Sequence, residues 1–160
     1  MGKRVTFPLT VYYDASCPLC ASEMHALKAR DMEGLLVLAD CSASAFDEEP
    51  GLREGVTRKM MLERIHARDA AGRWSSGLDV FEAVYRAAGF STLARVLGSA
   101  RLRPLLDRIY PWIAANRYRL SRLGLGRVFG LVAPAGCGNR DARSDCGSAP
   151  PLPKRASRRP

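Results

Sequence analysis

Residues 6–20 read TFPLTVYYDASCPLC, and this stretch decides the fold. Its first half is β-branched and aromatic with a proline near the start, which predicts a strand that enters from a free end and stops at Asp14. Residues 17–30 then predict a helix, because Pro18 suits the first helical position and basic residues occupy the last turn. The two cysteines of a C-x-x-C motif therefore fall on the first turn of a helix that directly follows a strand.

The next segment completes a β-α-β unit. Residues 35–39 form a continuous apolar run that ends at Asp40, a pattern typical of a buried central strand. In the helix between the two strands, Leu19, Met24 and Leu27 form one apolar stripe, which predicts its buried face. Parallel strands end at the same edge of a sheet, so the residues that follow each strand are expected to lie near one another.

A hairpin and a helix are predicted beyond a loop. Residues 60–67 alternate weakly and predict a strand, residues 69–72 predict a turn, and residues 73–75 begin the antiparallel partner strand. Residues 78–88 carry apolar side chains at helical spacing, and Gly89 stands where a glycine commonly follows a helix. The resulting order of strand, helix, strand, strand, strand and helix is that of a minimal thioredoxin-like α/β domain.

The rest of the chain divides into helices and a tail. Two or three further helices are expected, over residues 93–97, 104–110 and 112–123. Pro111 marks a break or kink between the last two. After Pro134 the residues are mostly small, polar or basic and cannot build a core. We therefore expect a thioredoxin-like domain with a C-terminal helical extension over residues 1–130 and a disordered basic tail over residues 131–160.

The C-x-x-C motif carries the chemistry. Disulfide exchange needs a thiolate nucleophile and a second thiol close enough to resolve the mixed disulfide. Cys17, at the helix N-terminus, meets unpaired backbone N–H groups and the positive end of the helix dipole, which predicts a stabilised thiolate and hence the nucleophile. Cys20, one turn inward and with less access to solvent, is the predicted resolving thiol. Asp14 either accepts the proton of Cys20 or forms the turn between strand and helix.

Two other functions are open for the same chain. The motif can form half of a structural zinc site, which needs a second pair of ligands. The candidates for that pair are poor, because Cys137 and Cys146 lie in a glycine-rich tail and His25 and His66 are isolated. Alternatively, the domain is redox-inert and binds an anionic partner through an arginine-rich helical face.

Several other residues near the motif have two interpretations each. Cys41 follows the second strand and is either a third thiol beside the motif or a buried, idle cysteine. Glu23 and His25, on the motif helix, either tune the site electrostatically or are ordinary surface residues. Trp74 and Trp112 are expected in the core or in a groove.

Composition bears on location and partners. The formal net charge is +9, and residues 101–130 carry seven arginines against one acidic residue, so the surface attracts anions of many kinds. The start of the chain loosely imitates a lipoprotein signal, but Asp14 stands where that signal needs an aliphatic residue. Because no apolar run is long enough to span a bilayer, we expect a cytoplasmic protein without a transmembrane segment.

The motif also resembles a known family signature. Residues 13–20, YDASCPLC, are similar to the opening Asp-x-x-Cys-x-x-Cys motif of the DCC family (DUF393) of thiol-disulfide oxidoreductases. Further positions resemble that family in order along the chain, namely Ile65, His66, Ala67, Gly72 and Gly77 in the hairpin region, then Tyr110, Ala114 and Arg117. The resemblance spans residues 6–125.

The resemblance implies a thioredoxin-like fold with Asp14, Cys17 and Cys20 as signature positions. It leaves the substrate open between a protein and a small-molecule thiol or disulfide. The chain differs from thioredoxins in the position of Pro18 within the motif. It also has no proline near Met60, before the third strand, where thioredoxins hold a cis-proline facing the disulfide. We therefore expect a cofactor-free dithiol exchange enzyme for which the usual backbone pairing with substrate is not predicted.

Overall fold

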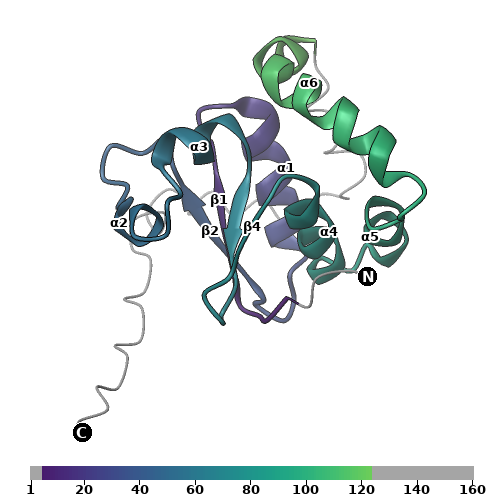
Figure 1. Cartoon of the computed structure of the whole chain (residues 1–160), viewed down its shortest axis with the longest axis horizontal. Coiled ribbons are helices and arrows are strands. Elements are labelled where there is room, and N and C mark those ends of the chain that lie inside the picture. Colours follow the sequence, from purple (N-terminus) through teal and green to yellow (C-terminus); the bar gives the residue numbers. More distant parts are fainter. Residues whose placement is uncertain (1–4, 124–160) are drawn as a thin grey trace, which may run out of the picture.

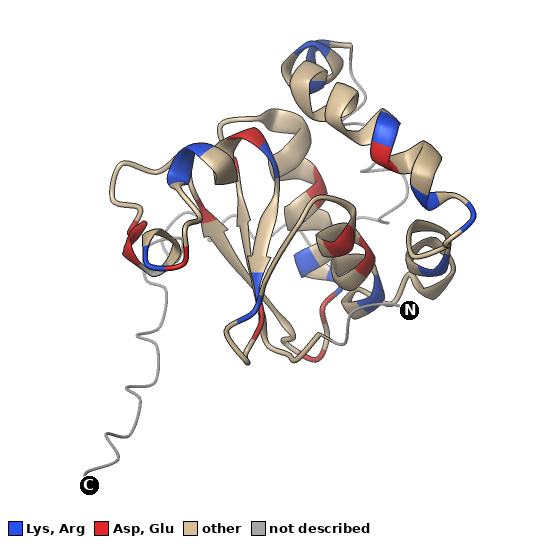
Figure 2. Cartoon of the chain, viewed as in Figure 1, with Lys and Arg blue, Asp and Glu red and all other residues tan. Residues whose placement is uncertain are grey.

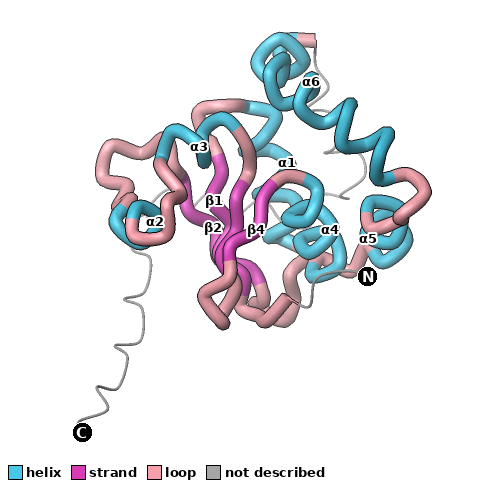
Figure 3. The backbone as a smooth tube through the Cα atoms, viewed as in Figure 1, coloured by secondary structure: helices cyan, strands magenta, loops and turns pink. Residues whose placement is uncertain are grey.

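A four-stranded mixed sheet runs through the middle of the molecule, with helices on both of its sides (Figures 1 and 3). This computed structural model describes residues 5–123. In chain order the elements are β1 (Leu9–Tyr13), α1 (Pro18–Ala29), β2 (Leu36–Asp40), α2 (Glu49–Leu52), α3 (Arg58–Glu63), β3 (His66–Arg68), β4 (Trp74–Ser76), α4 (Leu78–Ala87), α5 (Ser91–Leu97) and α6 (Arg103–Arg122). The strand order is β2-β1-β3-β4, with β1 parallel to β2 and antiparallel to β3. The predicted thioredoxin-like α/β fold is confirmed.

β1 is a central strand of the sheet, and both of its faces are buried. Leu9 and Val11 have no exposed surface, and with Tyr13 they belong to a core shared with α1 and α4. Further members of this main core come from five elements and include Met24, Leu27, Leu36, Ala67, Val80, Ala83, Val84 and Ala94. The buried residues of α1 are the three of the predicted apolar stripe, which is thereby confirmed.

A second, smaller cluster covers the other face of the sheet. Tyr12 belongs to this cluster and packs on Trp74, with ring centroids 5.0 Å apart, so Trp74 is a core residue as predicted. Cys41, directly after β2, and Met61 of α3 complete its buried part. Helices α1 and α4 thus cover one side of the sheet and α3 the other (Figure 1).

The segment before β3 differs from the prediction. The sequence predicts one strand over residues 60–67, but only the last two of these residues lie in β3. The preceding residues form α3, whose N-cap Thr57 accepts a hydrogen bond from the Met60 N–H at 3.3 Å. This helix buries Met61 in the second cluster. The cap and the burial together outweigh the weak alternation of the segment.

β2 lies at an edge of the sheet, which corrects the prediction of a central strand. Leu36 is 1% exposed, whereas the next four residues of the strand are only partly buried. The hairpin of β3 and β4 adds to the opposite side of β1 from β2, so β1 takes the central position. An apolar run alone does not show whether a strand has one neighbour or two.

The last helix, α6, is longer than predicted and contributes little to the core. Residues on both sides of Pro111 form one helix rather than two. No residue of α6 is buried, and Trp112, expected in the core or a groove, is 61% exposed. Tyr110 packs on Phe81 of α4, with ring centroids 5.8 Å apart. In Figure 1, α6 runs along the outside of the molecule.

Basic positions are spread along α6 with one acidic position among them, Asp107 (Figure 2). Arg103 forms ion pairs with Asp107, at 3.0 Å, and with Asp79 of α4, at 2.6 Å. Across residues 5–123, no helix combines the length and the apolar character that crossing a membrane needs. The predicted tail, residues 131–160, lies outside the described residues, so the boundary before it stays a prediction.

Replacing Met24 by alanine is expected to lower the free energy of unfolding by about 2–5 kcal/mol, because the truncation leaves a cavity in the main core. Met24 is 1% exposed, whereas Met32, in the connection after α1, is 90% exposed and provides a matched control. Met32→Ala is expected to change the same free energy by no more than about 0.5 kcal/mol. Urea unfolding of both variants measures the difference, and equal losses would contradict this description of the core.

Candidate functional site

The connection from β1 to α1 places both motif cysteines at the start of the helix. The Cys17 N–H donates to the Asp14 carbonyl oxygen at 3.3 Å, which closes a turn between strand and helix. Cys17 is the N-cap of α1 and Pro18 its first residue, as predicted, while Cys20 lies in the first turn. Both cysteines are free thiols, so the structure shows the reduced form of the motif.

Groups of the first helical turn act on the sulfur of Cys17. The Cys20 thiol and the backbone N–H groups of Cys20 and Leu19 favour its charged form. Together with the Arg117 guanidinium, these groups lower the pKa of Cys17 to about 6, and the Cys20 thiol contributes most. Burial acts in the opposite direction and is outweighed. The hydrogen bond from the Cys20 thiol to Cys17, together with burial, raises the pKa of Cys20 far above its usual range. The two shifts favour the thiolate at Cys17 and the protonated thiol at Cys20.

The access of solvent to the two cysteines is the reverse of the prediction. Cys17 has no exposed surface, whereas Cys20 is partly exposed. Ser16, directly before Cys17, has its hydroxyl 3.1 Å from the hydroxyl of Tyr118 on α6. The predicted nucleophile is therefore buried rather than exposed at the end of the helix.

Asp14 is 4% exposed and uses both carboxylate oxygens. Oδ1 accepts hydrogen bonds from the Ser16 N–H at 3.1 Å and the Ser16 hydroxyl at 2.5 Å. Oδ2 accepts from the Arg117 guanidinium at 2.8 Å and from the Tyr118 hydroxyl. Burial raises the pKa of Asp14, but these partners together outweigh burial and lower it. Of the two roles open for Asp14, the geometry favours the turn, because a carboxylate with a lowered pKa is a weak proton acceptor.

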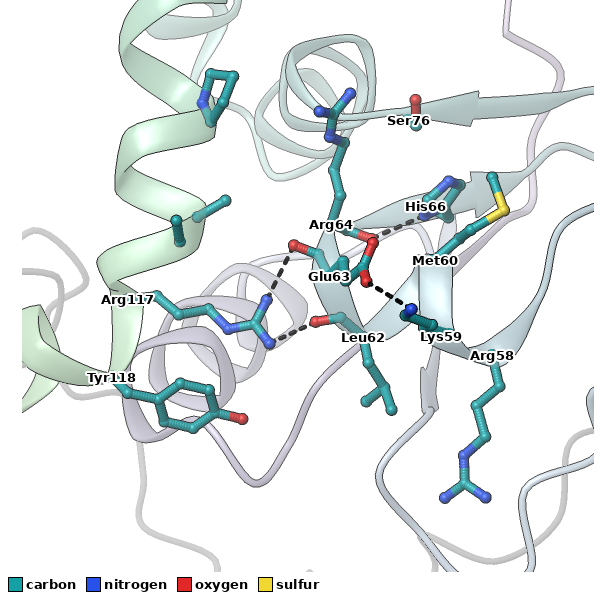
Figure 4. Close-up of a pocket in the computed structure, with 13 residues that line it drawn as sticks. Arg58, Lys59, Met60, Leu62, Glu63, Arg64, His66, Ser76, Arg117 and Tyr118 are labelled. Atoms are coloured by element: carbon teal, nitrogen blue, oxygen red, sulfur yellow. Dashed lines mark hydrogen bonds and ion pairs between the residues drawn. The ribbon is translucent and has the colours of Figure 1, made fainter.

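Arg117 connects three parts of the fold. From α6 its guanidinium reaches the Asp14 carboxylate, at the end of β1. It also donates to the carbonyl oxygens of Leu62 and Glu63 in the segment before β3, the second at 3.3 Å. Figure 4 shows the Arg117 side chain extending from α6 to this segment. Helix α6 is thus fastened beside the motif by polar contacts.

A small cavity of about 70 Å³ lies beside Cys20, and a carboxyl group forms part of its wall. Glu23, on α1 one turn after Cys20, lines this cavity and accepts a hydrogen bond from the Tyr85 hydroxyl at 2.6 Å. Burial raises the pKa of Glu23 to about 7, although the Tyr85 hydrogen bond opposes the shift. The spacing of Glu23 from Cys20 is visible in the sequence, whereas its burial depends on the packing of α4.

Residues on one face of α6 line the same cavity, and they include Ile113 as well as Tyr110, Ala114 and Arg117. The last three are spaced i, i+4 and i+7, which places them on one side of a helix, and they are the positions on which the C-terminal part of the family resemblance rests. The Tyr110 hydroxyl accepts a hydrogen bond from the Ile65 N–H, just before β3. The sequence marked these residues only through that resemblance, because no local pattern links them to the cysteines.

Other residues singled out in the sequence have different surroundings. The sulfur of Cys41 lies 3.8 Å from that of Met61, and burial raises the pKa of Cys41 to about 12, which favours the idle cysteine over the third thiol. His25 is exposed, with Nε2 2.9 Å from the Tyr13 hydroxyl. Within residues 5–123, no three His, Cys, Asp or Glu side chains are grouped so as to hold a metal ion. The two tail cysteines lie outside that range.

Comparison with known proteins gives a family match over most of the chain. The model of the DCC1-like thiol-disulfide oxidoreductase family matches residues 11–123. A chloroplastic protein of Arabidopsis thaliana, described only as uncharacterized, is 27% identical over 148 residues, which make up 92% of this chain and 66% of that protein. The chain thus spans just under two thirds of the length of this relative. No solved structure matches the chain.

Replacing Asp14 by asparagine is expected to lower the free energy of unfolding by about 2–4 kcal/mol at pH 7, because the partly buried Arg117 guanidinium loses its carboxylate. The loss depends on pH. Since the pKa of Asp14 is lowered in the folded protein, its contribution is complete above the unfolded-state pKa of about 3.9 and is lost as the pH falls through the folded-state value. Unfolding of parent and variant between neutral and acidic pH should therefore converge in acid. A constant difference would contradict a charged, paired Asp14.

Proposed function

This chain belongs to the DCC1-like thiol-disulfide oxidoreductase family, and on that premise we propose that it is an enzyme that exchanges disulfides through Cys17 and Cys20. The observation that carries the proposal is the position of Cys17 as the N-cap of α1 with Cys20 in the first turn, where the groups of that turn lower the pKa of Cys17. A cysteine with its pKa lowered in this way is a thiolate near neutral pH and attacks a disulfide without a cofactor. Cys20, in the same turn, is the second thiol that the reaction needs.

The proposed exchange has two displacements. The Cys17 thiolate attacks a substrate disulfide, so that a mixed disulfide forms, the substrate S–S bond breaks, and the departing thiolate takes a proton from water. Cys20 then loses its proton and attacks the Cys17 sulfur, which forms the Cys17–Cys20 disulfide and releases the second substrate thiol. Two electrons pass from the protein dithiol to the substrate. The reverse sequence oxidises a substrate dithiol, and the potentials of the two partners set the direction.

Glu23 is the proton acceptor for the second displacement in this proposal. In the mixed disulfide Cys17 carries no charge, but burial still raises the pKa of Cys20, so its thiol needs a base, and Glu23 lies one helical turn away on the wall of the same cavity. At roughly 30 Å³ per molecule, this cavity has room for water to relay the proton. The pKa of Glu23, about 7, suits proton exchange near neutral pH. The Tyr85 hydroxyl holds the carboxyl group in place.

Asp14 has a positioning role in the same proposal. Its Oδ1 fixes Ser16, so the turn before Cys17 has one shape. Its Oδ2 keeps the Arg117 guanidinium at the site, and the charge of that guanidinium contributes to the lowered pKa of Cys17. The contribution of Asp14 to catalysis therefore passes through the groups that it holds rather than through proton transfer.

Access to Cys17 requires a local movement, because the residue has no exposed surface. The contacts of α6 next to the nucleophile are polar and join Tyr118 to Ser16 and Asp14. None of the residues of α6 is buried, so a displacement of this helix leaves the main core intact. In the proposal, substrate reaches the sulfur when these polar contacts open.

The two alternatives from the sequence have less support. A zinc site lacks a cluster of ligands among residues 5–123. Two ion pairs reduce the positive charge that an arginine-rich face offers to an anionic partner, because Arg103 pairs with Asp79 and Arg117 with Asp14. The binding of an anionic partner by the remaining arginines stays a prediction, and so does a cytoplasmic location.

Cys17→Ser is expected to abolish disulfide formation at the motif when the reduced protein reacts with dithiodipyridine, a neutral disulfide. Cys20→Ser is expected to stop the reaction at a mixed disulfide on Cys17, which mass spectrometry of the tryptic peptides identifies. Because the pKa of Cys17 is lowered to about 6, the rate of the first displacement should rise through that pH and level off above it.

Cys41→Ser is the control for these two variants, since it removes a buried thiol from the second cluster. It should leave the rate of the first displacement and its pH profile unchanged. A rate that depends equally on Cys17 and Cys41, or that rises only above pH 8, would be evidence against the proposed nucleophile.

Glu23→Gln is expected to slow the second displacement about 10²-fold above neutral pH, because an amide cannot accept the proton of Cys20. In the parent protein this step should accelerate as the pH rises through about 7, where Glu23 ionises, and the variant should lack that rise. Glu33→Gln, the same change at an exposed position after α1, is the control. Stopped-flow decay of the mixed disulfide measures the step. Equal decay in parent and Glu23→Gln would remove Glu23 from the mechanism and leave the two cysteines in place.

A further inference from the structure

Resting on the proposed exchange function, we propose that the groove between α3, β3 and α6 binds carboxylate groups of the substrate, so that the preferred substrates are disulfides flanked by acidic groups. The groove has a volume of about 920 Å³, at the upper end of the range for ligand sites. It lies next to the motif, because Ala114 and Arg117 line both this groove and the cavity that holds Cys20.

The lining of the groove is strongly cationic. Four basic residues and one acidic residue line it, namely Arg58, Lys59, Arg64 and Arg117 with Glu63, and of the four only Arg117 is paired, among residues 5–123, with a carboxylate outside the groove, that of Asp14. Figure 4 shows three of the basic residues on the α3 and β3 side and Arg117 on the α6 side. Charges of one sign gathered in a groove with low-dielectric walls attract anions and raise their local concentration.

Two of these cations are placed to bind a ligand. The Lys59 side chain is 85% exposed and lies 3.9 Å from Glu63, which is a loose ion pair. Arg64 is exposed and contacts the face of the Tyr110 ring, with 6.0 Å between the guanidinium carbon and the ring centre. Arg58 instead donates to three backbone carbonyls in the loop after β2, so it shapes the groove and its charge is not neutralised by these contacts.

The backbone beside the motif is already occupied, which leaves recognition to side chains. Four successive carbonyl oxygens before β3 accept hydrogen bonds within the protein, those of Leu62, Glu63, Arg64 and Ile65. Arg117 donates to the carbonyls of Leu62 and Glu63. His66 Nδ1 donates to the Arg64 carbonyl at 2.7 Å, and the Gly77 N–H donates to the Ile65 carbonyl at 3.0 Å. A substrate chain therefore finds no unoccupied carbonyl in this segment, in accord with the absence of a proline before β3. Charge in the adjacent groove is the recognition that the site offers.

The test uses the full reduced chain and three disulfide-linked peptides of equal length, whose residues beside the cysteine are acidic, neutral or basic. Oxidised glutathione is added as a small disulfide that carries carboxylates. Chromatography of the released thiol gives a second-order rate constant for each substrate. The acidic peptide is expected to react about tenfold faster than the neutral one at low ionic strength. This advantage should shrink in about 1 M salt, where screening is nearly complete.

Two double variants, each of which removes two positive charges, distinguish the effect of charges in the groove from the effect of charges elsewhere on the surface. Lys59→Gln with Arg64→Gln removes two charges from the groove and is expected to abolish the preference for the acidic peptide. Arg119→Gln with Arg122→Gln removes two exposed charges from α6 outside the groove and is expected to retain it. The rate with neutral dithiodipyridine should be unchanged in the second double variant, whose residues lie outside the groove.

Equal rate constants for the three peptides would overturn the groove assignment, and so would an equal loss in both double variants, which would indicate general attraction. A preference for oxidised glutathione as well as the acidic peptide would support small anionic disulfides, and a preference limited to the peptide would support protein substrates. Failure of the proposed exchange function is detected separately, as the lack of a Cys17-dependent reaction with dithiodipyridine.

Discussion

The ion pair between Asp14 and Arg117 is the interaction on which the site depends. The two residues are 103 positions apart in the chain, and their side chains are 3% and 14% exposed. A buried pair of this kind is stable only where further hydrogen bonds satisfy both groups. Ser16 and Tyr118 donate further hydrogen bonds to the carboxylate, and two carbonyls before β3 accept hydrogen bonds from the terminal nitrogens of the guanidinium. One pair therefore fixes the turn before the nucleophile, the position of α6 and the segment that leads into β3.

Groups within this small region have pKa values shifted in opposite directions, and their partners explain why. The pKa values of Cys17 and Asp14 are lowered because several neighbouring groups favour the charged form of each. The pKa values of Cys20 and Glu23 are raised. The largest cause is the hydrogen bond to the Cys17 sulfur for Cys20 and burial for Glu23. A dithiol exchange site needs this division, because one sulfur must attack as an anion while the other stays protonated until the mixed disulfide has formed.

The unit of β1 and α1 could be predicted because its signals are local, from the β-branched and aromatic residues of the strand to Pro18 and the apolar stripe of the helix. The edge position of β2 and the short helix α3 could not, since they depend on where the hairpin pairs and on the burial of Met61. The same limit applies to the site. Glu23 becomes a buried carboxyl group only when α4 supplies Tyr85. Arg117 carried no signal beyond the family resemblance, because its partner Asp14 lies at the other end of the domain.

Helix α6 completes the site without joining the core. Four residues of α6 line the cavity beside Cys20. Tyr110 makes a ring contact, Ile113 and Ala114 are apolar, and Arg117 makes polar bonds, and none of the four is buried. Elements with few buried apolar contacts open at a lower free energy than the core does. In the proposed reaction, the sheet and α1 hold the two cysteines in place while the polar contacts of α6 open. This division reconciles a Cys17 without exposed surface with a reaction that needs its sulfur.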